Sequence, residues 1–285
     1  MLGFLNINKP SGMTSNAVVQ KVKKRFKLDK IGHFGTLDPM ASGVLPLAIG
    51  KATRLFEYSL SKKKGYIATF KFGEITDTLD ATGSILSSTD TIPSKADILA
   101  ILPSFIGEQS QMPPQYSAKN VNGRRAYDLA REGIKFELKP KEISIYKFDM
   151  LDELSDKEFS FYIECSSGTY IRAIGRDLAE KLGSLATMTS LNRVMAGEFN
   201  IDNAIDLDKC LECDNIDKIL LAPQDVFKFL GKINIDSVVY SKLRNGIRLT
   251  YGIIPKDSFV VCDGVLVGIA KKDDKILKLD TFLGE

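Results

Sequence analysis

The sequence predicts an α+β fold in which helices flank a mixed, largely antiparallel central sheet. Segments with strand-like alternation and segments with helical periodicity are interspersed along the chain without a regular β-α-β order, which favours this class. After about residue 231 the pattern changes to short β-rich runs, which are typical of a small β domain. We therefore predict a main body over residues 1–230 and a second domain over residues 231–285.

The first helix is expected over residues 14–27. Its apolar residues recur on one helical face, its Lys and Arg residues lie largely on the other faces, and Thr14 or Ser15 can cap its start. A strand is expected over residues 66–72, where the pattern alternates until Gly73 ends it.

Two further strands are expected over residues 143–148 and 159–165. The second leads through Ser-Ser-Gly into a helix over about residues 169–182, which Gly183 would end. Residues 200–218 are rich in Asp and have little strand character, so we expect a connector that contains a helix. In the C-terminal part, an Asp-Gly pair between two β-rich runs predicts a hairpin, and residues 276–282 follow as another strand.

The composition excludes several classes of protein. With 44% hydrophobic and 26% charged residues, the chain has the composition of a folded globular protein. No run of about 18 apolar residues is present, so no membrane span is expected, and the absence of a signal-peptide pattern predicts a cytoplasmic protein. His33 is the only histidine, and the four cysteines lack the spacing of a complete zinc site, so no metal is expected.

The charge is unevenly distributed along the chain. Residues 1–72 contain 13 Lys and Arg against three acids, a local charge of +10, whereas the remaining residues sum to −7. Such a basic first quarter suits a polyanion as partner. Within it, Asp38 is the only acid between Lys30 and Arg54, in a stretch rich in Gly and Pro. Two interpretations fit: a turn formed with Pro39, or a rigid loop that presents a catalytic carboxylate.

Other segments could also carry chemistry. Arg172 falls in the first turn of its helix, where the helix dipole disfavours a cation, so we expect an anionic partner such as Asp38 or a phosphate, unless the side chain extends into solvent. Tyr66 is either a half-buried strand aromatic or a stacking platform for a base. Asp77 and Asp80 are spaced three residues apart, which does not suit calcium and predicts a solvated loop with local caps.

A segment rich in Pro, aromatic and Arg residues extends over residues 111–127. A helix with a thin apolar stripe is expected over residues 124–132. Two interpretations are open, a flexible surface loop or a segment that closes over a ligand.

Six motifs occur in order between about residues 4 and 200. They are LNINKPSGMTS at 5–15, GHFGTLDPMASG at 32–43, YIATFKFGEITDTLDATG at 66–83, MPPQYSAKNVNGRRAYDLAR at 112–131, CSSGTYIR at 165–172 and Leu-Asn-Arg at 191–193. Together they resemble the bacterial tRNA pseudouridine synthase B family, whose members isomerise uridine 55 in the TΨC loop of tRNA. One motif alone is weak, but six in this order are very specific.

The resemblance implies a role for each matching residue. Asp38 is the catalytic aspartate, Tyr66 stacks on the flipped base, and Arg172 pairs with the aspartate. The other residues that the resemblance places at the substrate site are His33, Tyr170, Leu191 and Lys9.

The resemblance also implies the architecture and the partner. We expect a pseudouridine synthase fold, an RNA-clamping thumb over residues 112–139 and a short PUA-like RNA-binding domain over residues 231–285. The implied partner is the TΨC stem-loop of tRNA, bound by a monomer that needs no cofactor, membrane or protein partner and that can also assist tRNA folding. The thumb departs from the family pattern because Ala118 is followed by Lys119 and Asn120, where the family reads Leu-Lys.

The chemistry of this reaction agrees with a single carboxylate. A C–N glycosidic bond breaks and a C–C bond forms at the same sugar carbon, so the isomerisation is redox-neutral. Glycosidases typically use two carboxylates, so one acid disfavours hydrolysis. Whether Asp38 attacks the sugar, attacks the base or removes the 2′ proton stays open. Two other functions also stay open, a non-catalytic RNA-binding or tRNA-folding protein and a base-releasing glycosidase.

Overall fold

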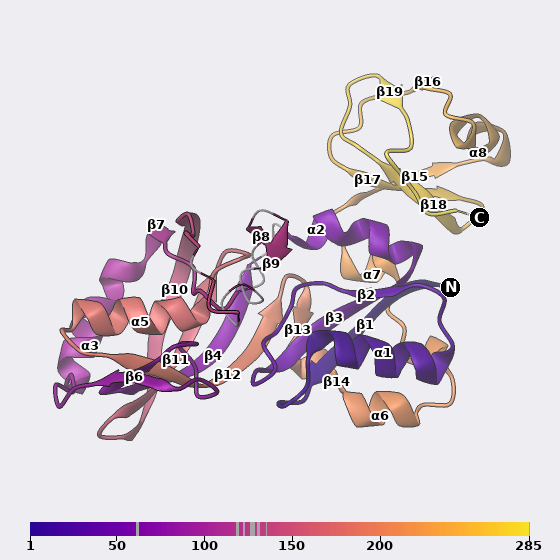
Figure 1. The fold of residues 1–285 in the computed structure, drawn as a ribbon. Coiled ribbons are helices and arrows are strands. Elements are labelled where there is room, and N and C mark those ends of the chain that lie inside the picture. Colours follow the sequence, from indigo (N-terminus) through magenta and orange to yellow (C-terminus); the bar gives the residue numbers. More distant parts are fainter. Residues whose placement is uncertain are drawn as a thin grey trace.

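The computed structural model describes residues 1–60, 63–117, 120–121, 123–125, 129, 132–134 and 136–284 (Figure 1). Its main element is a mixed sheet with the strand order β14-β1-β3-β12-β4-β11-β10-β7. These strands are β14 (Ile205–Asp206), β1 (Leu2–Lys9), β3 (Ser42–Gly50), β12 (Ala186–Ala196), β4 (Lys64–Phe72), β11 (Glu158–Cys165), β10 (Lys141–Ser155) and β7 (Gly107–Gln111). Two short strands, β2 (Ile31–His33) and β13 (Phe199–Asn200), pair with β3 and β12.

Antiparallel pairing dominates this sheet, so the predicted fold class is confirmed. Among the pairs along the order, β1 with β14 and β12 with β3 are parallel, and the others are antiparallel. The β12–β3 junction consists only of Asn192 opposite Ser42 and Arg193 opposite Gly43, whereas β12 pairs with β4 along residues 186–196. The sheet therefore has a narrow junction between two broad halves, which lie on the left and right of Figure 1.

Helices accompany both halves of the sheet (Figure 1). The helical elements are α1 (Ser15–Phe26), η1 (Lys51–Leu55), α2 (Phe56–Leu60), α3 (Lys95–Ile101), η2 (Leu102–Phe105), α5 (Ile171–Lys181), η3 (Ile201–Asn203), α6 (Leu207–Glu212), η4 (Ile216–Lys218), α7 (Pro223–Val226) and α8 (Ser237–Arg244). None of the helices in the described ranges is long and apolar enough to span a membrane.

Several predicted elements are confirmed at their expected places. Helix α1 begins after Thr14, whose hydroxyl accepts a hydrogen bond from the amide of Ala17, and it ends at Lys27 in a left-handed conformation. Helix α5 is also confirmed, although it begins at Ile171, two residues later than expected. The helix predicted in the Asp-rich connector is present as α6.

The C-terminal part forms a second sheet with the order β15-β17-β18-β20. Its strands are β15 (Gly231–Ile235), β17 (Ser258–Cys262), β18 (Val265–Ala270) and β20 (Thr281–Phe282), and β16 (Leu249–Thr250) pairs separately with β19 (Ile276–Leu277). Asp263 and Gly264 have φ values of +47° and +84°, which confirms the predicted hairpin turn. The single strand expected over residues 276–282 is wrong, because β19 and β20 belong to different sheets.

The second sheet shares a hydrophobic cluster with the main body. Phe259 and Leu283 pack in the same cluster as Phe4 and Val44. Arg54 also donates a hydrogen bond to the carbonyl of Phe282. The division at residue 231 therefore separates two sheets but not two isolated cores, and as a domain boundary it stays a prediction.

The segment predicted as a thumb contains a small hairpin of β8 (Asn120–Val121) and β9 (Arg124–Arg125). The helix predicted over residues 124–132 is therefore wrong at its start. Gly123, with φ of +87°, allows the tight reversal between these strands. Residues 126–128, 130 and 131, and the displaced Lys119, lie outside the described residues.

A further hairpin follows β4. Strand β5 (Glu74–Thr76) pairs with β6 (Ile85–Ser88), and the loop between them carries the two acids for which a solvated loop was expected.

Candidate active site

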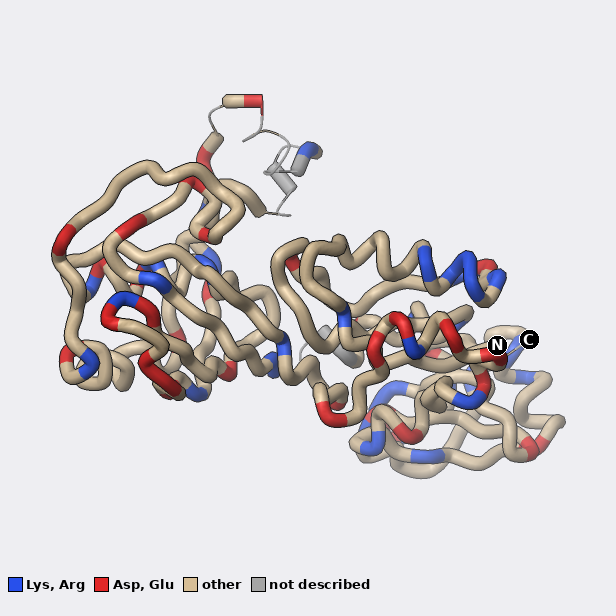
Figure 2. Tube along the Cα trace, turned by 90° about the horizontal axis from the view of Figure 1, so that it is seen from below, with Lys and Arg blue, Asp and Glu red and all other residues tan. Residues whose placement is uncertain are grey.

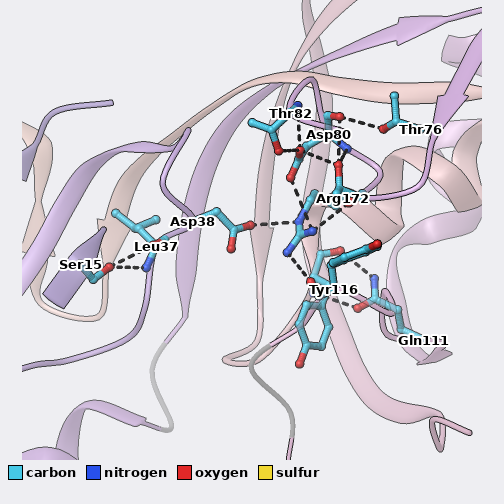
Figure 3. A network of polar contacts seen from close by, with 11 residues as sticks. Ser15, Leu37, Asp38, Thr76, Asp80, Thr82, Gln111, Tyr116 and Arg172 are labelled. Carbon is cyan, nitrogen blue, oxygen red and sulfur yellow. Dashed lines mark hydrogen bonds and ion pairs between the residues drawn. The ribbon is translucent and has the colours of Figure 1, made fainter. Parts of the chain in front are cut away.

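The loop that carries Asp38 is held in place by the segment before α1. The hydroxyl of Ser15 donates to the carbonyl of Leu37 at 3.0 Å and accepts from its amide at 2.8 Å (Figure 3). The amide of Gly12 donates to the carbonyl of Pro39 at 2.8 Å. The amide of Ala41 closes a turn on the carbonyl of Asp38 at 3.1 Å. The turn expected with Pro39 is therefore present, and its rigid backbone presents the carboxylate of Asp38.

Lys9 supports the same loop from below the surface. Its side chain is fully buried, and Nζ donates to three backbone carbonyls, among them that of Pro39 at 3.3 Å. Burial lowers the pKa of Lys9 to about 8; Asp38 opposes this shift, and Arg193 adds to it. Lys9 is thus a structural cation beneath the Asp38 loop, where the resemblance implied a supporting role.

Arg172 is the partner of Asp38. Its Nε lies 3.0 Å from Asp38 Oδ2, and its Nη1 lies 3.5 Å from Asp80 Oδ2 (Figure 3). The guanidinium also donates to the carbonyls of Thr78 at 2.8 Å and Tyr116 at 3.0 Å. Only 8% of the Arg172 side chain is exposed, against 35% of that of Asp38. The expectation that Asp38 is the anionic partner is confirmed, and the alternative of a solvent-extended arginine is wrong.

Asp80 is a member of the site that the sequence did not reveal. It was expected in a solvated loop, but only 5% of the residue is exposed. Its Oδ1 accepts hydrogen bonds from the hydroxyls of Thr78 and Thr82 and from the amide of Thr82. The predicted local caps are present, but they orient a buried carboxylate toward Arg172 instead of a solvated one. A Thr two residues before and after an Asp was the only available signal.

The start of α5 is fixed by Gln111, a second residue that sequence reasoning missed. The backbone amide of Tyr170 donates to Gln111 Oε1 at 2.9 Å, and Gln111 Nε2 donates to the carbonyl of Tyr170 at 3.1 Å. Gln111 is buried at the end of β7, so it joins that strand to the turn before Arg172. These two bonds fix the backbone of the residue that directly precedes α5, a helix whose N-cap residue makes no side-chain capping bond.

Tyr66 and Arg193 form the buried wall of the site. Tyr66 is buried on β4 rather than half-buried, and burial raises the pKa of its phenol to about 12. Arg193 opposes this rise in the pKa of the phenol, and its Nε and Nη2 donate to the carbonyls of Val44 at 2.8 Å and Gly35 at 3.0 Å. Arg193 is fully buried, and no ion pair joins it to an acid within the described ranges. Apart from the matching Leu-Asn-Arg motif, no sequence pattern predicts this role of Arg193.

The remaining predicted residues lie around this wall at different depths. Leu191 is buried on β12 opposite Ala68 of β4. His33 lies on β2, and its pKa is lowered by burial and by Arg193, so the ring is neutral. Tyr170 directly precedes α5, and among the described residues its side chain forms no hydrogen bond with Asp38. The structure therefore brings Lys9, Tyr66, Arg172 and Asp38 into one electrostatic environment and places the others at its margin.

The arrangement provides one accessible carboxylate beside a buried phenol. A guanidinium holds this carboxylate in a fixed direction, and the second carboxylate at the guanidinium is buried. Such a group can act as a nucleophile or as a base toward a ligand placed against Tyr66. In the described part of the chain, no group of three or more His, Cys, Asp or Glu residues is arranged to hold a metal ion.

Known proteins share both the sequence and the fold. The family described as TruB family pseudouridylate synthase (N terminal domain) matches residues 23–171. A protein named tRNA pseudouridine synthase B from Clostridium novyi is 42% identical over 290 residues, which cover 99% of this chain and 100% of that protein. One of the same name from Clostridium kluyveri is 42% identical over 87% of this chain and 86% of its own length.

Solved structures extend the likeness to the fold. A Cbf5-Nop10-Gar1 complex contains a chain that matches with a TM-score of 0.72 at 24% identity, over 99% of this chain and 84% of that one. A chain from an H/ACA RNP bound to a substrate RNA containing 2′-deoxyuridine matches with a TM-score of 0.71 at 23% identity, over 99% of this chain and 85% of that one. The fold, the matched residues and the close relatives together establish that the chain is an enzyme that belongs to the TruB family of pseudouridylate synthases.

Proposed function

We propose that the chain isomerises uridine 55 in the TΨC loop of tRNA to pseudouridine and that Asp38 is its catalytic carboxylate. The observation that carries this proposal is the geometry of Asp38, a partly exposed acid whose Oδ2 is held 3.0 Å from Arg172 Nε. The tRNA substrate is supported by full-length relatives named tRNA pseudouridine synthase B.

The burial of the second acid supports isomerisation over hydrolysis. A glycosidase that releases the base uses one carboxylate on the bond and another one to activate water or form an intermediate. Asp80 is not available for that task, because it is buried and its oxygens are occupied by Thr78, Thr82 and Arg172. With one accessible carboxylate, the detached uracil has to be held for recapture, and Tyr66 and Leu191 supply an apolar wall for it.

The target base has to leave its stack to reach Asp38. Flipping costs a few kcal/mol, which stacking against an aromatic ring partly offsets. Tyr66 provides that ring, and the raised pKa of its phenol keeps it neutral at physiological pH. In this proposal Tyr170 and the neutral His33 line the pocket, and Lys9 holds the Asp38 loop.

The charge distribution supports an RNA partner. Lys and Arg residues gather along the second half of α1, where its last turn contains Lys23, Lys24 and Arg25 (Figure 2). Neutralised phosphates release counterions, so affinity for tRNA should fall as the salt concentration rises. We expect the chain to act as a cytoplasmic monomer, with residues 112–139 as thumb and 231–285 as a PUA-like contact; assistance to tRNA folding can coexist with the activity.

The test is the substitution Asp38→Asn, which removes the negative charge at nearly constant size. Tritium release from tRNA labelled at C5 of uridine should fall to background, while tRNA binding should persist. Replacing uridine 55 in the tRNA should abolish turnover by the wild-type chain. Retained turnover by Asp38→Asn would exclude Asp38 as the catalytic group, and free uracil among the products would identify a glycosidase instead.

A further inference from the structure

A cluster of cations lies beside the Asp38 loop, and the mechanism above does not use it. Lys64, at the start of β4, borders Gly35 together with Arg193: a methyl group built on Gly35 would lie 3.0 Å from Lys64 Nζ and 3.4 Å from Arg193 Nη1. Lys141, at the start of β10, is the third member of the cluster and, like Arg193, acts on Lys64. The three side chains come from different strands, so the fold itself gathers them.

Lys64 differs from the other two cations because its amino group is available. Arg193 is fully buried and directs its donors to backbone carbonyls, and Lys141 Nζ lies 3.4 Å from the carbonyl of Ser167. For Lys64 Nζ, no hydrogen bond or ion pair with any residue in the described ranges is found, although its side chain is partly buried.

The groups that face Lys64 do not neutralise it. Burial, together with Arg193 from β12 and Lys141 from β10, lowers its pKa to about 8, and the thiol of Cys165 on β11 acts in the opposite direction. That thiol is itself neutral, since burial raises its pKa to about 11. An ammonium group that is partly desolvated among cations gains most from an incoming anion.

The position of Lys64 indicates which anion it meets. Residues two apart on a strand point to the same face and are separated by about 6.6 Å. Lys64 therefore lies on the same face as Tyr66, one repeat nearer to the start of the strand. If Tyr66 stacks on the flipped base, the group beside it along the RNA is a backbone phosphate. We propose that Lys64 binds a phosphate adjacent to the target uridine. This inference rests on the proposed function, because the stacked base defines the register of the RNA.

Single-turnover pseudouridine formation tests the inference. The rate at increasing enzyme excess over a TΨC stem-loop yields both Kd and the limiting rate. Lys64→Met should raise Kd about tenfold or more and make its dependence on log salt shallower by about one, because one phosphate contact is lost. The limiting rate should stay within about threefold, since a positioning contact acts before the chemical step. Lys64→Arg, which keeps the charge, should stay close to wild type.

Lys63→Met is the matched control. Lys63 is the adjacent residue, but its Nζ pairs with Glu164 at 2.8 Å and its side chain is 55% exposed. Its removal should leave Kd nearly unchanged. In the wild type, Kd should rise between about pH 7 and about pH 9 as Lys64 loses its proton, and this rise should be smaller in Lys64→Arg.

A stem-loop with a single neutral methylphosphonate beside the target uridine identifies the group that is bound. It should weaken wild-type binding by about tenfold and weaken Lys64→Met no further. Additive losses, an unchanged Kd in Lys64→Met, or an equal loss in Lys63→Met would overturn the inference. An absence of pseudouridine formation by the wild type would instead refute the proposed function, so the two failures are distinguishable.

Discussion

The substitution Asp80→Asn isolates the buried end of the Asp38–Arg172–Asp80 network. Asn keeps the size of Asp and can still accept hydrogen bonds from Thr78 and Thr82 at Oδ1. What it loses is the negative charge of Oδ2, which lies 3.5 Å from Arg172 Nη1. The amide nitrogen that replaces this oxygen is a hydrogen-bond donor, and it would face Arg172 Nη1, which is also a donor.

The magnitude follows from distance and burial. At 3.5 Å and an effective dielectric constant of about 20, opposite unit charges attract each other by about 5 kcal/mol before their desolvation is subtracted. Arg172 keeps Asp38 and two backbone carbonyls as partners, so we expect a net loss of about 1–3 kcal/mol. Part of this loss should affect the direction of Asp38, because Arg172 can then move toward it. The limiting rate should therefore fall by about 3- to 100-fold.

Single-turnover tritium release at saturating enzyme measures this rate, and urea unfolding measures the loss of stability. Asp77→Asn is the matched control: Asp77 lies three residues earlier in the same loop, and its side chain accepts a hydrogen bond from the amide of Ser84 at 2.8 Å. It should leave the limiting rate close to wild type. A wild-type rate in Asp80→Asn, or an equal decrease in Asp77→Asn, would refute the role of Asp80 in orienting Arg172.

Two further predictions concern the supports of the site. Gly43→Ala should destabilise the fold by more than about 2 kcal/mol, because φ is +101° and the new Cβ would lie 2.3 Å from the carbonyl oxygen of Arg193. Gly246→Ala, where φ is +79° and the space around the new Cβ is open, should cost only about 1 kcal/mol. Urea unfolding of both variants measures the difference. Lys9→Met should destabilise the fold more at pH 9.5 than at pH 7.5. Folding lowers the pKa of Lys9 from 10.5 to about 8, so between these pH values the unfolded wild-type chain binds more protons than the folded one, and wild-type stability rises with pH. An equal loss of stability at both pH values would contradict this.

Local patterns predicted those parts of the fold whose causes are local. Helix α1 has a capping Thr14 and an apolar face, and the turn at Asp263 and Gly264 needs residues that tolerate positive φ. The position of Arg172 in the first turn of α5 also indicated an anionic partner, and the structure confirms Asp38 in that place. Each of these signals lies within a few residues of the feature that it predicts.

The parts that the sequence did not predict depend on contacts between distant segments. Gln111 is an ordinary strand residue until it meets the backbone of Tyr170, 59 residues later. In the sequence, Asp80 has the pattern of an ordinary loop acid. Its ion-pair partner Arg172 lies on α5, far away in the chain, so the pairing appears only in the folded protein. Arg193 sits in a strand, and its carbonyl partners at Gly35 and Val44 belong to another half of the sheet. Burial of this kind is a property of the assembled fold.

The narrow junction of the sheet explains why so many supports converge on Asp38. This acid belongs to the half that contains β3, while Arg172 and Tyr66 belong to the half that contains β4. Only two residue pairs of β12 and β3 join the halves within the sheet, and one of them is Arg193 opposite Gly43. Relative motion of the halves would therefore change the distance from Asp38 to its guanidinium.

Arg193 opposes that motion, because it lies on β12 and binds the backbone of the Asp38 loop at Gly35 and of β3 at Val44. The close approach at Gly43, where no side chain would fit, allows the junction to form. Buried polar groups of this kind contribute little net stability, because the cost of desolvating both partners offsets their attraction. A displacement that leaves one partner unpaired is costly, however, so they fix the geometry. Arg193 is buried with no acid partner among the described residues, and in return it holds the Asp38 carboxylate of one half at 3.0 Å from Arg172 of the other.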